Sequence, residues 1–139
     1  MNEYSKRISR FCSLEIVELK EILLPERPPP KIVEKALHKE GLEIEDKKNQ
    51  EAAGFALDMN GSSLHSIEFS RLLHQHLFVQ GQSIAFIIGS SYGLSPCIKK
   101  KYSCLSFSSL TFPHQLCRIL LLEQIFRGFK IQAGEVYHK

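Results

Sequence analysis

Three stretches of this sequence combine short apolar runs with small polar residues in a way that suits ligand binding. They are Leu57-Asp58-Met59-Asn60-Gly61, Ile88-Gly89-Ser90-Ser91-Tyr92-Gly93 and Phe107-Ser108-Ser109-Leu110-Thr111-Phe112. Small side chains leave backbone amides and carbonyls accessible, and such groups can hydrogen-bond the adenine and ribose of a nucleoside. Because ligands of parallel sheets lie beyond the carboxyl ends of the strands, we expect all three stretches to meet at one nucleoside-binding edge.

The glycine loop at residues 88–93 has other interpretations when it is taken alone. It matches neither the G-x-x-x-x-G-K-[ST] phosphate loop nor the G-x-G-x-x-G fingerprint, and two glycines also serve ordinary tight turns. A serine hydrolase that uses His114 is a further interpretation, but the sequence has no G-x-S-x-G nucleophile elbow. Most other histidines are interpreted as surface or hydrogen-bonded residues, namely His38, His65, His74 and His76.

Alternating strands and helices must position these loops. Strands are predicted at 14–19, 52–59, 84–88 and 104–108. Residues 1–11 are predicted to be the last turns of a helix, and further helices are predicted at 31–48, over 64–79 with Ser62, Ser63 or Ser66 at its start, at 96–101, and at 113–130. This alternation predicts an α/β fold with a mostly parallel sheet flanked by helices, and the length of 139 residues predicts one domain.

Composition narrows the functional classes. The net charge of +3 permits an anionic partner such as RNA, and Lys99-Lys100-Lys101 is either a solvated turn or a contact to RNA phosphate. The four cysteines form no C-x-x-C pair and show no zinc-ligand spacing, so we expect reduced thiols, a cytoplasmic location and no metal. The apolar run at 119–122 is far shorter than the roughly 20 residues of a membrane span, so no membrane partner is expected.

Several blocks from residue 84 onward occur in the order and spacing of a known family. The blocks are Phe86-Ile87-Ile88-Gly89, Gly93-Leu94, Leu105-Ser106-Phe107-Ser108, Leu110-Thr111-Phe112-Pro113-His114-Gln115, Arg118, Glu123-Gln124, Phe126-Arg127 and Tyr137-His138-Lys139. On these blocks the chain resembles the ribosomal RNA large subunit methyltransferase H family, which belongs to the SPOUT superfamily of S-adenosylmethionine-dependent methyltransferases. More loosely, Glu3-Tyr4, Glu40-Gly41 and Leu57-Asp58 also match.

The resemblance implies a fold, a reaction and partners. The fold would be a SPOUT-type α/β domain with a deep C-terminal trefoil knot, and the protein would be a homodimer whose partner chain completes each active site. The reaction would be N3-methylation of a pseudouridine in 23S ribosomal RNA of the large subunit, within the assembled ribosome. Carried onto this chain, the S-adenosyl-L-methionine pocket would comprise Leu57, Gly89, Phe107, Ser108, Ser109, Leu110, Thr111 and Phe112.

The same resemblance gives the catalytic candidates. The N3 atom of a uracil-type ring carries a proton at neutral pH, so a base or a group that stabilises the ring anion would help methyl transfer. His138 has a suitable intrinsic pKa, and Arg118 can stabilise an anion. His114 and Tyr137 are further candidates, and the sequence leaves the order among the four open.

Two departures from the family pattern matter. The family has an extra strand, a glycine-containing turn and most of a helix ahead of the position that matches Met1, so the domain at 1–139 is expected to lack them and to expose a sheet edge. Ser90 stands where the family usually has a second glycine. If that position needs positive φ, serine there would destabilise the fold by about 1 kcal/mol or more.

These departures keep other interpretations open. One is a catalytically weak or inactive relic that binds RNA or the ribosome. Another is a SPOUT enzyme that acts on transfer RNA, although the sequence has no appended RNA-binding module. The apolar stripe around Leu116, Ile119 and Leu120 is interpreted as packing against the fold or against a dimer mate.

Overall fold

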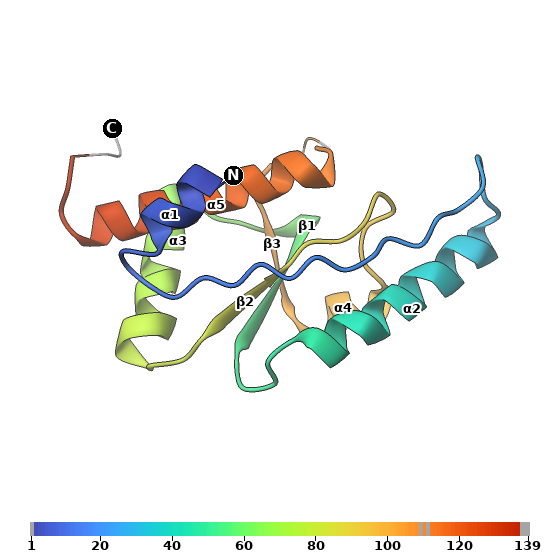
Figure 1. Ribbon diagram of the computed structural model, residues 1–139, viewed down its shortest axis with the longest axis horizontal. Helices are drawn as coiled ribbons and strands as arrows, with labels where there is room; N and C mark the ends of the chain where they lie inside the picture. The colour runs from blue at the N-terminus through green and yellow to red at the C-terminus, as the bar shows by residue number, and fades with distance from the viewer. Residues whose placement is uncertain (1, 109, 111, 137–139) are drawn as a thin grey trace.

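The computed structural model describes residues 2–108, 110 and 112–136 of the chain. These residues form a parallel sheet with helices on both faces (Figure 1). The elements in chain order are α1 Asn2–Ile8, α2 Pro30–Lys47, β1 Ala53–Ser63, α3 Ser66–His74, the π-helical turn η1 Gln75–Val79, β2 Ile84–Ile87, α4 Pro96–Lys101, β3 Ser103–Ser106 and α5 His114–Gln132. The α/β class and the parallel sheet expected from the sequence are confirmed.

The described sheet has three strands in the order β2-β1-β3, and both ladders are parallel. The central strand β1 pairs Ala53 with Ile84 on one side and Leu57 with Leu105 on the other. A central strand is covered on both faces, which explains the nearly continuous apolar run at residues 52–57.

The strand β1 is longer than the sequence indicates. Asn60-Gly61 was expected to end it in a turn, but β1 runs to Ser63 with a register shift between Leu57 and Ser62. The shift depends on Gly61, because a β-carbon there would lie 2.5 Å from the Cys104 carbonyl carbon. Glycine therefore permits close approach of two backbones where the pattern indicated a chain reversal.

The core has two layers. The larger cluster lies between the sheet and α1, α3 and α5, and includes Phe55, Phe69 and Phe126. The smaller cluster lies on the other face, where Ala56 and Ile87 pack beneath α4. Burial of these apolar side chains on both faces holds the sheet rigid enough to position the loops at its edge.

Helices α3 and α5 pack closely because of one small residue. A β-carbon on Gly128 would lie 2.7 Å from Leu73 Cδ1, so glycine is needed for this approach. At the same crossing the Ser70 hydroxyl donates to the Gly128 carbonyl at 2.9 Å and accepts from Gln132 Nε2 at 2.9 Å. These two bonds satisfy a fully buried hydroxyl between the helices.

The strand predicted at 14–19 was wrong. Residues 14–19 are extended but do not join the sheet, since no backbone–backbone hydrogen bond connects residues 13–21 to another described segment. The helix expected over 64–79 begins at Ser66, one of the three polar starts considered, and follows His65, whose N–H donates to the Glu68 carboxylate at 3.1 Å. In the described part of the chain, no helix is long and apolar enough to span a membrane.

Candidate functional site

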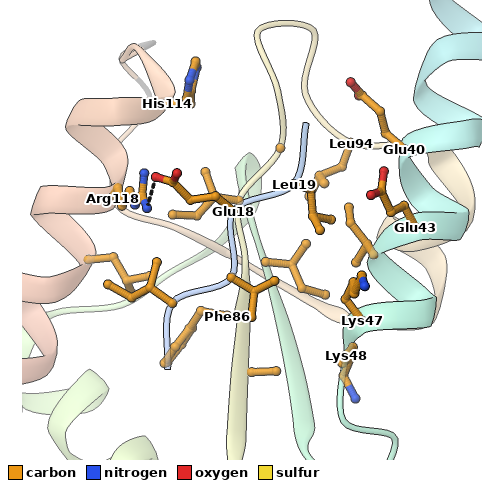
Figure 2. A pocket seen from close by; sticks show the side chains of 18 of the residues that line it. Glu18, Leu19, Glu40, Glu43, Lys47, Lys48, Phe86, Leu94, His114 and Arg118 are labelled. Carbon is orange, nitrogen blue, oxygen red and sulfur yellow. Dashed lines mark ion pairs between the residues drawn. The ribbon is translucent and has the colours of Figure 1, made fainter. Parts of the chain in front are cut away.

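A groove runs along the outer edge of β2. It is lined by residues 13–21, by α2, by β2 and the glycine loop, and by the first half of α5, and its volume is about 710 Å³ (Figure 2). We call this cavity the β2 groove. Three of the predicted site residues, Gly89, His114 and Arg118, lie on its wall. The structure therefore brings together part of the cofactor set and part of the catalytic set.

Arg118 enters the β2 groove from α5, one helical turn after His114. Its side chain is only 16% exposed and pairs with the Glu18 carboxylate at 2.5 Å, as Figure 2 shows. Glu18 is 69% exposed, so water screens the pair on that side. The ion pair thus orients the Arg118 guanidinium. Its charge is partly balanced by the Glu18 carboxylate, which solvent can reach.

The glycine loop is a tight turn in which both glycines have a structural role. Gly93 has φ +88°, a conformation that side-chain-bearing residues avoid. At Gly89 a β-carbon would lie 2.4 Å from the Gly93 carbonyl oxygen, so the two ends of the loop touch. Ser90 and Gly93 close the turn, because the Gly93 N–H donates to the Ser90 carbonyl at 2.9 Å.

The structure answers the question raised by Ser90. Among the described non-glycine residues only Arg27 has positive φ, so Ser90 carries no such strain. Its hydroxyl donates to Glu40 Oε1 at 2.9 Å, and the other oxygen of Glu40 accepts from the Ile22 N–H at 3.2 Å. Glu40 therefore ties the glycine loop to the segment that follows α1.

We expect Ser90→Ala to lower the free energy of unfolding by about 1 kcal/mol, because it removes one hydrogen bond to a partly buried carboxylate. Urea unfolding would measure the change. Ser63→Ala is the matched control, since Ser63 is exposed and has no side-chain partner among the described residues. Equal stability of the Ser90→Ala variant and the parent would show that the Glu40 contact contributes nothing.

A second carboxylate holds the other side of the loop. The Ser91 N–H donates to Glu21 Oε1 at 3.1 Å, and this backbone hydrogen bond lowers the pKa of Glu21 below its ordinary value of 4.5, with a smaller contribution from His114. A depressed carboxyl pKa stabilises the folded state above the unfolded pKa, and the effect is lost as pH falls through the folded pKa. Glu21 therefore supports the loop only in its charged form.

We expect the parent protein to lose stability relative to Glu21→Gln as the pH is lowered from above 4.5 to below the depressed pKa. Urea midpoints measured from neutral pH down to the acid limit of folding would show the two curves converging. Glu26→Gln, at an exposed position outside the groove, should run parallel to the parent throughout. Parallel curves for Glu21→Gln would contradict the assigned role.

Among the described cofactor candidates, Gly89 and Phe107 lie just beyond the carboxyl ends of β2 and β3, while Leu57 lies within β1. Leu57 is opposite Leu105, Gly89 follows β2, and Phe107 follows β3. The Phe107 ring packs edge-on to Phe69 with centroids 6.0 Å apart, which leaves the backbone rather than the ring for a ligand. Small residues and a glycine with no room for a β-carbon fit a nucleoside cofactor held by backbone groups.

The structure brings only part of this set into the β2 groove. Of the described cofactor residues, Gly89 alone lines it, while Leu57, Phe107, Ser108, Leu110 and Phe112 do not. The Ser108 hydroxyl accepts from the Leu110 N–H at 3.0 Å, so this loop is bonded internally. Ser109, Thr111, Tyr137 and His138 lie outside the described residues.

Sequence reasoning missed the acidic residues that hold the site. Glu18, Glu21 and Glu40 bond Arg118 and the glycine loop. Glu18 lies in the strand predicted at 14–19, and Glu21 follows it. Only Glu40 carried a signal, because Glu40-Gly41 matches the resembled family.

Within residues 2–108, 110 and 112–136, no group of three or more histidine, cysteine, aspartate or glutamate side chains could hold a metal ion.

Fold and site together define an α/β protein with a ligand-binding edge at a tight glycine loop. A family description, predicted SPOUT methyltransferase, matches residues 1–138. Ribosomal RNA large subunit methyltransferase H of Clostridium kluyveri (strain NBRC 12016) is 46% identical over 141 residues, covering 100% of this chain and 88% of the relative. The protein of that name from Clostridium tetani is 43% identical over 141 residues with the same coverage. That from Streptococcus sanguinis is 41% identical over 138 residues, covering 99% of this chain and 87% of the relative.

These matches extend over essentially the whole chain. The protein belongs to the SPOUT methyltransferase family and, within it, groups with the ribosomal RNA large subunit methyltransferases H. The family resemblance drawn from the sequence blocks is confirmed. Methyl transfer to large-subunit ribosomal RNA is accordingly the activity of its relatives, and the hydrolase interpretation is wrong.

Proposed function

We propose that this protein transfers a methyl group from S-adenosyl-L-methionine to N3 of a pseudouridine in 23S ribosomal RNA. The observation that carries the proposal is the position of Gly89. It lies at the strand-end edge where the cofactor is expected and also on the wall of the β2 groove with His114 and Arg118. A methyl donor at that edge would stand beside groups able to handle the substrate proton.

In this proposal the cofactor is held by Leu57, Gly89 and the backbone of residues 107–112. The cofactor supplies an electrophilic methyl group. The close Gly89–Gly93 contact leaves no room for a side chain at Gly89, so backbone groups form the contact there. Positioning of the target nitrogen against the methyl group is then the main catalytic contribution of the protein.

Two residues of the β2 groove are assigned to the target base. Arg118, already oriented by Glu18, stabilises the anion that forms when N3 loses its proton. His114, one turn earlier on α5, accepts that proton. Tyr137 and His138 stay candidates for the same roles on the strength of the family resemblance.

We also propose a homodimer. The first half of α5 carries apolar side chains that the described chain leaves open, since Leu116 is 40% exposed and Ile119 is 39% exposed, while Leu110 nearby in sequence is 69% exposed. The buried residues of α5 begin only at Leu121, after its first two turns. An exposed apolar helix face of this kind fits a contact with a second copy that would complete each site.

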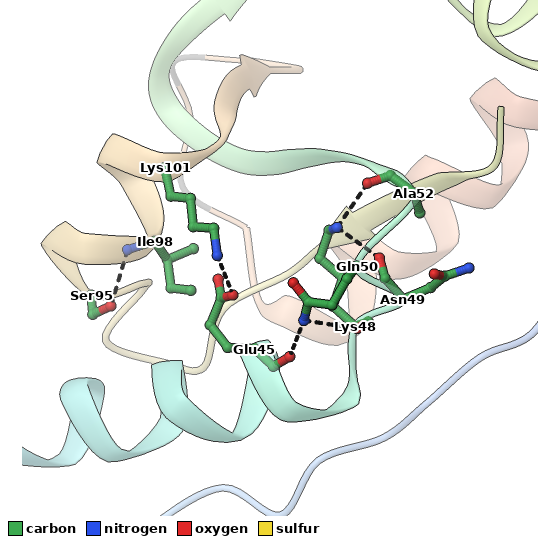
Figure 3. Close-up of polar contacts among 8 residues, drawn as sticks. All are labelled: Glu45, Lys48, Asn49, Gln50, Ala52, Ser95, Ile98 and Lys101. Carbon is green, nitrogen blue, oxygen red and sulfur yellow. Dashed lines mark hydrogen bonds and ion pairs between the residues drawn. The ribbon is translucent and has the colours of Figure 1, made fainter. Parts of the chain in front are cut away.

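The substrate is proposed to be the assembled ribosome in the cytoplasm, with residues 1–139 acting as one catalytic domain and with neither metal nor membrane required. Two of the three lysines of α4, Lys99 and Lys101, are expected to contribute less to RNA binding than their spacing indicates. Lys101 bonds Glu45 at 2.6 Å, as Figure 3 shows, and Lys99 lies 3.9 Å from Asp58. These contacts favour a structural role in fastening α4 to α2 and β1.

The deep trefoil knot implied by the family is part of the same proposal. The segment expected to complete it includes Ser109 and Thr111 and the residues from 137 onward, which lie outside the described part of the chain. Resistance of the C-terminal segment to a proteasome-like unfoldase that pulls from that end would test for a knot.

The second candidate function is an inactive relic that binds the ribosome. It is motivated by the edge of β2 that the described sheet leaves unpaired beside the site. Incubation with methyl-labelled S-adenosylmethionine and ribosomes lacking the modification separates the two. Label in 23S RNA, located at N3 of a pseudouridine, is the expected result. Ribosome binding without label supports the relic, and label in free transfer RNA alone would overturn both.

A further inference from the structure

The proposed cofactor has two ends that differ in chemistry. Its adenosine suits backbone groups and small side chains, whereas its amino-acid end carries an α-ammonium and an α-carboxylate, which bind best to charged partners. None of the described cofactor candidates has a charged side chain, namely Leu57, Gly89, Phe107, Ser108, Leu110 and Phe112. Partners for the amino-acid end therefore have to come from residues next to them.

The topology of the sheet indicates where those partners should lie. The chain leaves β1 for α3, whose Phe69 and Leu73 belong to the larger core cluster on one face of the sheet. It leaves β2 for α4, whose Ile98 belongs to the smaller cluster on the other face (Figure 1). Because β1 and β2 are neighbours, their connections diverge to opposite faces. Such a divergence opens a crevice between two strands, and ligands of parallel sheets bind there.

Asp58 lies at this crevice. The last pair of the β1–β2 ladder is Ala56 with Ile87, and Asp58 and Gly89 each lie two residues beyond it. The strand β1 also leaves its register with β3 directly after Leu57. Since Ala56 belongs to the smaller core cluster, strand alternation directs the Asp58 side chain to the same face, toward α4.

Asp58 shares this position with Lys99 of α4. Asp58 Oδ2 and Lys99 Nζ are 3.9 Å apart, and the two side chains are 17% and 40% exposed. That distance exceeds a hydrogen bond, and Asp58 accepts none from the described chain. The ion pair thus fastens α4 to β1 but leaves the acceptor sites of the carboxylate and the donors of the ammonium available for a ligand.

The pair complements an amino acid in sign and in spacing. The nitrogen and the carboxylate carbon of an α-amino acid lie about 2.5 Å apart, from their bond lengths and angle. A zwitterion alongside the pair brings its ammonium to Asp58 and its carboxylate to Lys99, so each charge faces its opposite. Glu21 and Glu40, the carboxylates nearest the glycine loop, already accept hydrogen bonds from that loop. Asp58 differs from them because its hydrogen-bonding capacity is unused within the described chain.

We propose that Asp58 and Lys99 form a zwitterion clamp that binds the amino-acid end of S-adenosyl-L-methionine. Asp58 accepts from the α-ammonium, and Lys99 donates to the α-carboxylate. The inference rests on the cofactor proposed above and adds two binding residues to its site. On binding, two charge-assisted hydrogen bonds replace the long Asp58–Lys99 contact. With adenosine held at one end and the clamp at the other, the sulfonium between them is fixed in position.

Three thioethers are the probes, so that the sulfonium charge is not a variable. S-adenosylhomocysteine carries both charged groups, its decarboxylated analogue carries only the ammonium, and methylthioadenosine carries neither. In calorimetric titration of the parent protein we expect S-adenosylhomocysteine to bind at least about tenfold more tightly than methylthioadenosine. Equal affinities for these two ligands would overturn the clamp.

Two variants assign the two charges separately. Asp58→Asn should weaken binding of S-adenosylhomocysteine and of its decarboxylated analogue by about tenfold, and should leave methylthioadenosine within about twofold. Lys99→Met should weaken binding of S-adenosylhomocysteine but not of the decarboxylated analogue. Asp46→Asn and Lys100→Met are the matched controls, because both residues are exposed and have no side-chain partner in the described chain. Neither control should change any of the affinities.

The pattern across ligands separates the clamp from simple support of the fold. A variant that is partly unfolded loses apparent affinity for all three ligands by the same factor, so the ratios within one protein do not change. Equal weakening of all three ligands by Asp58→Asn would assign Asp58 to the ribose or to the fold and overturn the clamp. Saturable binding of free methionine that S-adenosylhomocysteine does not displace would assign the pair to a separate amino acid, with the same consequence.

Failure of the clamp and failure of the proposed function give different results. If the parent protein binds neither S-adenosylmethionine nor any of the thioethers, the proposed cofactor is overturned and the clamp with it. If the parent binds S-adenosylmethionine but the Asp58→Asn and Lys99→Met proteins keep its ligand preferences, the clamp alone is overturned.

Discussion

Replacing Gly89 by valine is expected to abolish binding of S-adenosylmethionine and to lower the free energy of unfolding by about 2 kcal/mol. The first β-carbon atom would lie 2.4 Å from the Gly93 carbonyl oxygen and 3.0 Å from Leu94 Cγ. A backbone oxygen cannot rotate away as a side chain does, so the loop has to open. Because Gly89 belongs both to the strand-end edge and to the β2 groove, this opening disturbs both at once. Calorimetric titration with the cofactor and urea unfolding measure the two effects.

Gly81→Ala is the control for a glycine substitution that costs stability without touching the site. Gly81 has φ +62° and open space around its α-carbon, so alanine there adds only backbone strain of about 1 kcal/mol. We expect the Gly81→Ala protein to bind the cofactor like the parent. Cofactor binding by a folded Gly89→Val protein with parental affinity would mean that the pocket lies away from this loop.

The second large effect is expected from Arg118→Ala, which should lower the rate of methyl transfer to ribosomes by about 100-fold or more while cofactor affinity changes by less than about threefold. The Arg118 side chain is only 16% exposed and lines the groove assigned to the target base. Its loss removes stabilisation of the ring anion but none of the strand-end contacts. Single-turnover rates with saturating cofactor would isolate the effect.

Two companion variants separate catalysis from simple support of the fold. If Arg118 served only to fasten residues 13–21 through Glu18, Glu18→Gln would lower the rate as much as Arg118→Ala. We expect Glu18→Gln to retain most of the activity, since it leaves the guanidinium in place and less neutralised. Arg118→Lys keeps the charge but loses the planar fork, and an intermediate rate is expected. Equal losses in the Glu18→Gln and Arg118→Ala proteins would sink the catalytic assignment.

Much of the architecture could be predicted because burial leaves a local pattern. The apolar run at Ile84–Ile87 and the continuous apolar stretch of β1 indicated strands covered on both faces, and both lie in the sheet. The helices predicted at 31–48 and 96–101 are present as α2 and α4, and the Ser95 hydroxyl before α4 accepts from the Ile98 N–H. In each case a few neighbouring residues determine the outcome.

The errors came from contacts between distant residues. Alternation at 14–19 is typical of a strand, but a strand also needs a partner, and whether one lies beside it is not written in those six residues. Asn60-Gly61 is a common turn, yet here the glycine serves the approach of β1 to the Cys104–Leu105 peptide. The propensity was right in both places and the tertiary setting overrode it.

The candidate site was predicted to a similar extent. Gly89, His114 and Arg118 were singled out from blocks of sequence, and the structure places them on one groove wall. The pairing of Arg118 with Glu18 and the bridge from Ser90 through Glu40 to Ile22 could not be predicted, because they join residues 100 and 50 positions apart without any sequence pattern. Ser90 itself was judged by a glycine rule that applies only at positive φ, and its backbone lies outside that region.

The pairing of the strands also bears on how quickly the chain can fold. Every ladder of the described sheet connects remote positions, residue 53 with residue 84 and residue 57 with residue 105, and none is a hairpin. No strand pair can form until a long loop has closed, and the entropy of that closure is lost before any apolar contact offsets it. Helices such as α5 can form locally and early, whereas the sheet has to wait for both crossovers. The topology therefore makes this a slow-folding chain whose β-strands remain unpaired, and open to association, for much of its folding time.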